Sequence, residues 1–96
     1  MDVRQLLEEK RNDILRIAAA HRAYNLRVFG SVARGESDAD SDVDFLVELA
    51  PGCGLLQYAA LVRELEQLLG RKVDVVSEKG LRPRMKDRIL SEAMPL

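Results

Sequence analysis

The stretch FGSVARGESDADSDVDFLV, residues 29–47, constrains this chain more than any other. It opens at the end of a short apolar run and continues with Gly30 and Ser31, which predicts a strand that ends in a tight turn. It closes with a second apolar run in which Asp42 and Asp44 stand two residues apart. Side chains alternate between the two faces of a strand, so both carboxylates are predicted to project from one face.

Such a pair of carboxylates is unfavourable unless something compensates its charge. At about 4 Å and an effective dielectric constant of about 20, two like charges repel by roughly 4 kcal/mol. A divalent cation removes this repulsion, and Mg²⁺ takes carboxylate oxygens together with the phosphate oxygens of a substrate. The two acids therefore predict a metal site that also holds phosphate.

The turn before the acids supplies phosphate-binding groups. Gly30 lets the backbone approach a phosphate closely, and the Ser31 hydroxyl can donate a hydrogen bond to it. Arg34 can contact a phosphate or brace the acidic loop that follows. No Gly-Lys-Ser/Thr sequence follows at Walker A spacing, so the turn is not a P-loop.

The rest of the chain predicts an α/β fold, a short mixed sheet of about three strands flanked by helices, in a single domain over residues 1–96. A long first helix is expected from residue 2 to about residue 22, capped by Asp2. The other expected elements are strands over 26–29, 42–49 and 73–76, and helices over 55–69 and 83–93.

The third apolar run is interrupted by one acid, Asp74. One interpretation is an edge strand with Asp74 in solvent. The other is that Val73 and Val75 face the core while Asp74 faces the Asp42 and Asp44 pair on a neighbouring strand. An acid among valines is the kind of local inconsistency that can mark function, but the residues alone leave both interpretations open.

The acidic loop is interpreted mainly as solvated turn, with acids at Glu36, Asp38 and Asp40. Ser41 is singled out because it directly precedes Asp42 and could orient it. The last helix is basic and has Met85, Ile89 and Leu90 on its apolar side. Its basic residues form either a solvated face or a docking patch for an acidic partner or the nucleotide: Arg82, Arg84, Lys86 and Arg88.

Three further residues are given structural interpretations. His21 is expected to be a surface or helix-end residue, since no partner is visible for it. Cys53 is interpreted as incidental, because it has no nearby histidine and no metal-ligand spacing. Tyr58 is expected to pack in the core stripe of its helix.

Composition excludes several functional classes. The net charge is −1, so no general nucleic-acid binding is expected. No apolar run approaches the roughly 20 residues that span a bilayer, so no membrane association is expected. The charged N-terminal segment does not have the pattern of a signal peptide. The single cysteine cannot form an internal disulfide. A cytoplasmic location is the expectation.

The pattern Gly-Ser-x-x-Arg-Gly, a short spacer and Ser-Asp-x-Asp-x-x-Val resembles the signature of the DNA polymerase β-like nucleotidyltransferases. At 96 residues the chain looks like the minimal nucleotidyltransferases, the MntA-like antitoxins encoded beside HEPN-domain toxins. The resemblance extends to GRKVDVV, residues 70–76. It implies a catalytic and metal-binding set, with two Mg²⁺ ions expected, made of Asp42, Asp44 and Asp74. It also implies a nucleotide-binding set of Gly30, Ser31, Arg34 and Ser41.

The same resemblance implies an enzyme that transfers AMP from ATP to a tyrosine of a cognate HEPN toxin and so neutralises it. Two alternatives remain open. One is an antitoxin with an idle site that only binds and masks the toxin. The other is a nucleotidyltransferase for a small molecule of the aminoglycoside type, which the absence of a second domain disfavours. The intact serine and three acids favour chemistry over masking.

Overall fold

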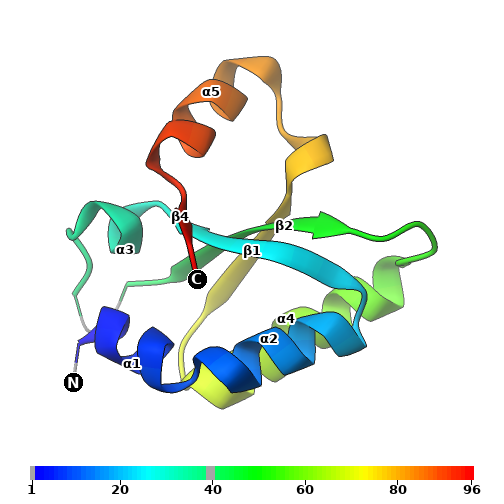
Figure 1. Cartoon of the computed structure of the whole chain (residues 1–96), viewed down its shortest axis with the longest axis horizontal. Helices are drawn as coiled ribbons and strands as arrows, with labels where there is room; N and C mark the ends of the chain where they lie inside the picture. The colour runs from blue at the N-terminus through cyan, green and yellow to red at the C-terminus, as the bar shows by residue number, and fades with distance from the viewer. Residues whose placement is uncertain (1, 39–40) are drawn as a thin grey trace.

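The computed structural model describes residues 2–38 and 41–96 and shows alternating helices and strands (Figure 1). In chain order the elements are α1 (Val3–Glu9), α2 (Arg11–Ala20), β1 (Ala23–Phe29), α3 (Ser31–Arg34), β2 (Val43–Leu49), α4 (Leu55–Leu69), β3 (Val73–Ser77), the 3₁₀ helix η1 (Glu78–Gly80), α5 (Pro83–Glu92) and β4 (Met94–Pro95). No helix in these two ranges is long and apolar enough to cross a bilayer.

The strands form one mixed sheet in the order β3-β2-β1-β4. The β2 and β3 strands are parallel, whereas β1 is antiparallel to both β2 and β4. The predicted α/β class with a mixed sheet is thus confirmed, with one strand more than expected. That strand, β4, is two residues long and adds only a short edge to β1, so it carries no period-2 pattern that a sequence could reveal.

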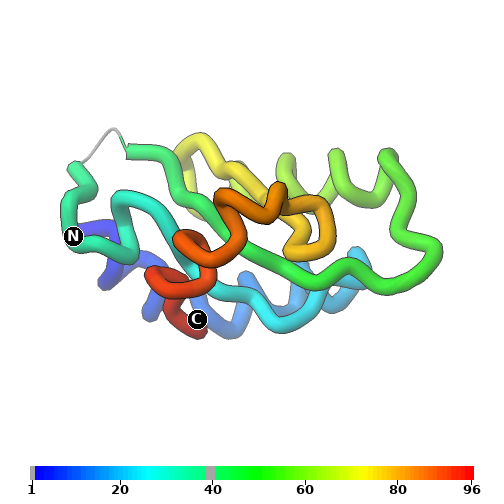
Figure 2. Tube along the Cα trace, turned by 90° about the horizontal axis from the view of Figure 1, so that it is seen from above, coloured from blue at the N-terminus to red at the C-terminus, as the bar shows by residue number. Residues whose placement is uncertain are grey.

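The helices lie on both faces of the sheet. Figure 1 shows α1 and α2 end to end under one face, with α4 alongside α2, while α5 stands over the other face. Seen from above, α5 crosses over the sheet (Figure 2). The predicted inward face of β2 is confirmed, since Val43, Phe45 and Val47 are almost completely buried against the three-helix layer. The core thus lies between the sheet and α1, α2 and α4.

The α5 helix contributes little to this core. Ile89 is its one buried residue, with 5% of its surface exposed. Met85, which the sequence places on the apolar side of the helix together with Ile89, is 53% exposed. The helix stands off the sheet, and Met85 lines a cleft between α5 and the sheet instead.

The predicted first helix is two helices that meet at Lys10, where φ is −96° and ψ is 7°. No proline or glycine signals this junction, and hydrogen bonds of the helical type continue through Lys10 on both sides. Asp2 caps α1 as predicted, accepting a hydrogen bond of 2.8 Å from the backbone N–H of Gln5. Val3 and Ile14, one from each helix, belong to the same core.

The first strand begins at Ala23, three residues earlier than predicted. The register with β2 shifts between Tyr24 and Arg27, and Asn25 has a φ of +51°. Asparagine tolerates this left-handed conformation, so Asn25 marks a bulge within β1 and not the boundary of the strand.

Candidate active site

The turn after β1 is shaped around Asp44. Gly30 has φ +75° and ψ −152°, a combination that side-chain-bearing residues rarely adopt. A Cβ atom added at Gly30 would lie 2.2 Å from Oδ2 of Asp44. Glycine is therefore required at position 30 for two reasons: it adopts the backbone conformation, and it leaves room for the Asp44 carboxylate.

The sheet register brings the predicted acids to one place. Asp44 of β2 is paired with Phe29, the last residue of β1, and with Asp74 of β3. Val43 and Phe45 face the core, so Asp44 faces the opposite side of the sheet, and its register partner Asp74 lies beside it. Asp42 directly precedes β2 and is exposed, as is Asp74. Asp42 thus stands at the strand start and not within the strand.

The surroundings of Asp44 disfavour its negative charge. Its partial burial raises the pKa of the carboxyl above the ordinary value, and the negative charges of Asp74 and Asp42 raise it further. Arg34 opposes this effect only weakly. The site therefore disfavours negative charge on Asp44 unless a cation is bound.

The donor chemistry of the three acids fits a hard divalent cation, because all of the candidate ligands are carboxylate oxygens. The neighbouring acids Asp74 and Asp42 and the partial burial raise the pKa of Asp44 against the opposing effect of Arg34, so a bound cation would relieve this repulsion. In residues 2–38 and 41–96, however, no three His, Cys, Asp or Glu side chains are positioned as a ready-made metal site. Asp42, Asp44 and Asp74 are thus adjacent but do not form a closed ligand set.

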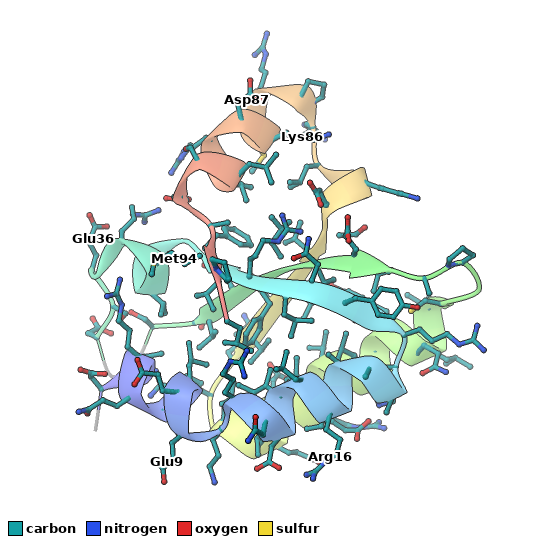
Figure 3. All side chains as sticks on the ribbon, in the orientation of Figure 1. Glu9, Arg16, Glu36, Lys86, Asp87 and Met94 are labelled. Carbon is teal, nitrogen blue, oxygen red and sulfur yellow. The ribbon has the colours of Figure 1, made fainter. Side chains whose placement is uncertain are left out.

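Arg34 holds the neighbouring elements together. Its Nε donates to Glu36 at 2.9 Å, and its Nη1 donates to Glu92 of α5 at 3.0 Å. Glu36, labelled in Figure 3, lies just past the end of α3. Of the two roles predicted for Arg34, bracing the acidic loop is the one visible here, together with a link from α3 to α5.

Ser41 acts on the loop and not on Asp42. Its hydroxyl accepts a hydrogen bond of 2.9 Å from the backbone N–H of Asp38 and lies 3.2 Å from the Asp38 carboxylate, to which it donates. Its carbonyl accepts from Arg71 at 3.3 Å. Ser41 therefore fixes the backbone that leads into β2. Asp40, interpreted as part of the solvated turn, lies outside the described residues.

A cleft of about 530 Å³ separates this end of the sheet from α5. Its volume falls in the range of small-molecule sites. The predicted residues Gly30, Ser31, Arg34, Ser41, Asp42 and Asp44 all line it, whereas Asp74 lies beside Asp44 outside the lining set. The wall formed by α5 consists of Arg84, Met85, Arg88, Ile89 and Glu92.

Sequence reasoning left Arg84 and Arg88 open between a solvated face and a docking patch for an acidic partner or the nucleotide, and it did not assign Met85, Ile89 or Glu92 to the site. The signal was present in the basic character of residues 82–88, but a solvated face and a binding face have the same helical spacing. Which face a helix turns toward a cleft depends on the tertiary placement of the helix, and α5 has too small an apolar face to predict that placement.

The structure also places His21, Tyr58 and Cys53, for which the sequence predicted structural roles. His21 does have partners: its Nδ1 lies 2.7 Å from Oε1 of Gln57, and its Nε2 contacts the carboxylate of Glu64. Tyr58 packs against the core as predicted, and its hydroxyl donates to the carbonyl of Val75 at 2.7 Å. Cys53 is a free, partly buried thiol.

Comparison with known proteins agrees with this geometry. The sequence model of the family described as "Nucleotidyltransferase domain" matches residues 7–95. A Methanocaldococcus jannaschii protein, provisionally assigned as a protein adenylyltransferase, is 41% identical over 88 residues, which cover 92% of this chain and 95% of that protein.

Solved structures with the same fold support the match. One, provisionally described as a minimal nucleotidyltransferase, is 50% identical and superposes with a TM-score of 0.88 over 100% of this chain and 97% of its own. A crystal structure of a toxin–antitoxin with AMP-PNP superposes with a TM-score of 0.75, covering 88% of this chain and 69% of its own. At 20% identity, this second likeness is one of fold.

Proposed function

This chain belongs to the nucleotidyltransferase-domain family, and we propose that it is a protein adenylyltransferase acting as an antitoxin. In this proposal it transfers AMP from ATP to a tyrosine of a cognate HEPN-domain toxin and thereby neutralises the toxin. The tyrosine oxygen attacks the α-phosphorus of ATP, the bond from that phosphorus to the α–β bridging oxygen breaks, and pyrophosphate leaves.

The proposed roles follow the positions of the residues. Asp42, Asp44 and Asp74 hold Mg²⁺, which when bound neutralises charge on the phosphates. Asp74 is exposed at the open side of the site, where it can accept the proton of the attacking hydroxyl. Gly30 and Ser31 hold the leaving phosphates at the start of α3. The work of these side chains is positioning and charge compensation, which dominate phosphoryl-type transfers.

The observation that carries the proposal is the placement of Gly30, Asp44 and Asp74 at adjacent positions across three neighbouring segments. A fold selected for stability alone gains nothing from a glycine that makes room for a partly buried carboxylate beside a second one. This arrangement favours a working site over an antitoxin that only masks its partner.

The proposed acceptor class rests on the relatives and on the shape of the chain. The most similar relatives include a provisional protein adenylyltransferase, and one structure of the same fold is a toxin–antitoxin with AMP-PNP. Asp42, which lines the cleft, and Asp74, which pairs with Asp44 in the sheet, are both exposed. A hydroxyl on another protein could therefore reach the acids.

The test is the intact mass of the HEPN-domain toxin partner after incubation with this protein, ATP and Mg²⁺. We expect the toxin to gain the mass of one or more AMP units. In the variant Asp42→Asn/Asp44→Asn, the rate of this transfer should fall at least 100-fold. Peptide mapping of the modified toxin then identifies the acceptor residue.

The matched control is Asp13→Asn/Asp87→Asn, which removes the same number of charges outside the cleft, at partly exposed Asp13 and exposed Asp87. It should retain wild-type transfer. Full activity in the Asp42/Asp44 variant would refute the site assignment. A toxin that is silenced in a stable complex without any mass change would favour masking over transfer.

A further inference from the structure

The helix α5 carries two arginines whose surroundings set them apart. Arg84 and Arg88 both line the cleft that contains Asp42 and Asp44. Across residues 2–38 and 41–96, neither guanidinium has a hydrogen-bond or ion-pair partner, whereas Arg34 on the opposite wall has two. Cationic side chains that face a cleft without a partner are available to a ligand.

Arg84 and Arg88 have no evident role in holding the fold together. Both are exposed, and α5 contributes only Ile89 to the buried part of the molecule. The helix is held near the sheet by Ile89 and by the 3.0 Å ion pair of Glu92 with Arg34. Packing therefore does not explain why Arg84 and Arg88 lie on the cleft wall.

The charge distribution in the cleft indicates the class of ligand. The sheet side presents Asp42 and Asp44, and Arg34, which lines the cleft on that side, is already bound by Glu36 and Glu92. A polyphosphate held near Gly30 and Ser31 would lack positive partners from the sheet side alone. Arg84 and Arg88 supply two positive charges from the other side.

Their spacing suits one polyphosphate. Residues four apart lie on one face of a helix, separated by about 6 Å along the axis. Guanidinium groups donate paired hydrogen bonds to phosphate oxygens, which makes arginine well suited to phosphate recognition.

From these observations we propose that Arg84 and Arg88 bind the β- and γ-phosphates of the nucleoside triphosphate, so that α5 forms the cationic wall of the nucleotide site. This inference rests on the proposed function, since it names residues that hold the substrate of that reaction. It assigns two named arginines of α5 to the nucleotide, where the sequence left open a solvated face or a docking patch for an acidic partner or the nucleotide.

The test is isothermal titration of a non-hydrolysable ATP analogue, and separately of AMP, into the full chain with Mg²⁺ present. The variant Arg84→Gln/Arg88→Gln should bind the ATP analogue at least tenfold more weakly than wild type, because hydrogen bonds to charged groups contribute strongly to affinity. Its affinity for AMP, which lacks the β- and γ-phosphates, should change less than threefold.

The control is Arg82→Gln/Lys86→Gln, which removes the same two charges from the same helix region at residues that do not line the Asp42 and Asp44 cleft. Figure 3 labels Lys86 on α5 beside Asp87. This control should keep wild-type affinity for both nucleotides. Equal weakening in both double variants would show a general charge effect and overturn the proposal.

Other outcomes distinguish a failure of the phosphate-binding role of Arg84 and Arg88 from a failure of the proposed adenylyltransferase function. If the wild type binds the ATP analogue and transfers AMP while Arg84→Gln/Arg88→Gln binds it equally well, the assignment of α5 is wrong and the proposed function stands. Loss of toxin binding with unchanged nucleotide affinity would also overturn it, in favour of a partner surface. A wild type that binds no ATP analogue would overturn both proposals.

Discussion

At the scale of single residues, Gly30 shows how backbone conformation and site chemistry depend on each other. Its φ of +75° and ψ of −152° lie in a region that is essentially open to glycine alone. The 2.2 Å approach of a hypothetical Cβ to Asp44 means that a side chain would also displace a proposed metal ligand. We expect Gly30→Ala to lower the free energy of unfolding by about 1–3 kcal/mol and to reduce AMP transfer at least tenfold.

The chain offers a matched control for that substitution. Gly35 has the same φ of +75°, but its ψ of 19° is in the ordinary left-handed region and nothing lies within 4 Å of an added Cβ. Gly35→Ala should cost about 1–2 kcal/mol of stability and leave transfer intact. Stability is measured by urea denaturation and transfer by intact mass. Equal activity of the two variants would contradict the role assigned to Gly30.

At the scale of elements, His21 links the end of α2 to α4 through Gln57 and Glu64. Its hydrogen bond to Gln57 and its contact with Glu64 raise the pKa of His21, against the opposing effects of burial and of Arg63. A raised pKa means that the folded state holds the proton more tightly than the unfolded state. The resulting stabilisation is present below the ordinary value of 6.5 and is lost as the pH rises through the raised value.

The corresponding variant is Glu64→Gln. Wild-type stability should fall by up to about 1 kcal/mol between pH 6 and pH 8.5, and this slope should become flatter in the variant. Asp13→Asn, which breaks an exposed ion pair with Arg16 on α2, should keep the wild-type slope. Urea denaturation across this pH range measures the effect. A variant with the wild-type slope would show that Glu64 does not set the protonation of His21.

Some features of the helices and strands can be predicted from the sequence and others cannot. Val43, Phe45 and Val47 alternate with Asp44 and Glu48 at period two, so the inward face of β2 follows from local pattern. Leu46 is the exception on the outward side, because it is apolar and fully buried. The break at Lys10 and the bulge at Asn25 have no comparable pattern, because they depend on how each segment meets the sheet. The residues on the sheet side of the cleft could therefore be predicted from the sequence.

The α5 wall of the site was not predictable for a related reason. Residues 83–92 carry a helical pattern with few apolar positions, and such a pattern does not determine the position of the helix relative to the sheet. That position depends on Ile89 and on the Arg34–Glu92 ion pair, whose partners are 58 residues apart in the chain. Long-range contacts of this kind leave no local signal.

At the scale of the whole molecule, the site is expected to lower the stability of the metal-free protein. Burial and the charges of Asp74 and Asp42 raise the pKa of Asp44, so the folded state binds its proton more tightly than the unfolded state does. Stability therefore falls as the pH rises from the ordinary value of 3.8 through the raised value, and it stays low above it. Ionised Asp44 is a cost that the fold carries at neutral pH.

Removing that charge should consequently stabilise the protein while abolishing its proposed activity. We expect Asp44→Asn to raise the free energy of unfolding at pH 7, without metal, by about 0.5–2 kcal/mol, and to converge with wild type below pH 3.8. Exposed Asp87, outside the cleft, provides the control Asp87→Asn, which should not show this gain. Added Mg²⁺ should raise the melting temperature of wild type more than that of Asp44→Asn, because binding to the folded state stabilises it. An Asp44→Asn protein less stable than wild type at pH 7, with no difference in response to Mg²⁺, would mean that this carboxylate serves the fold and not a cation.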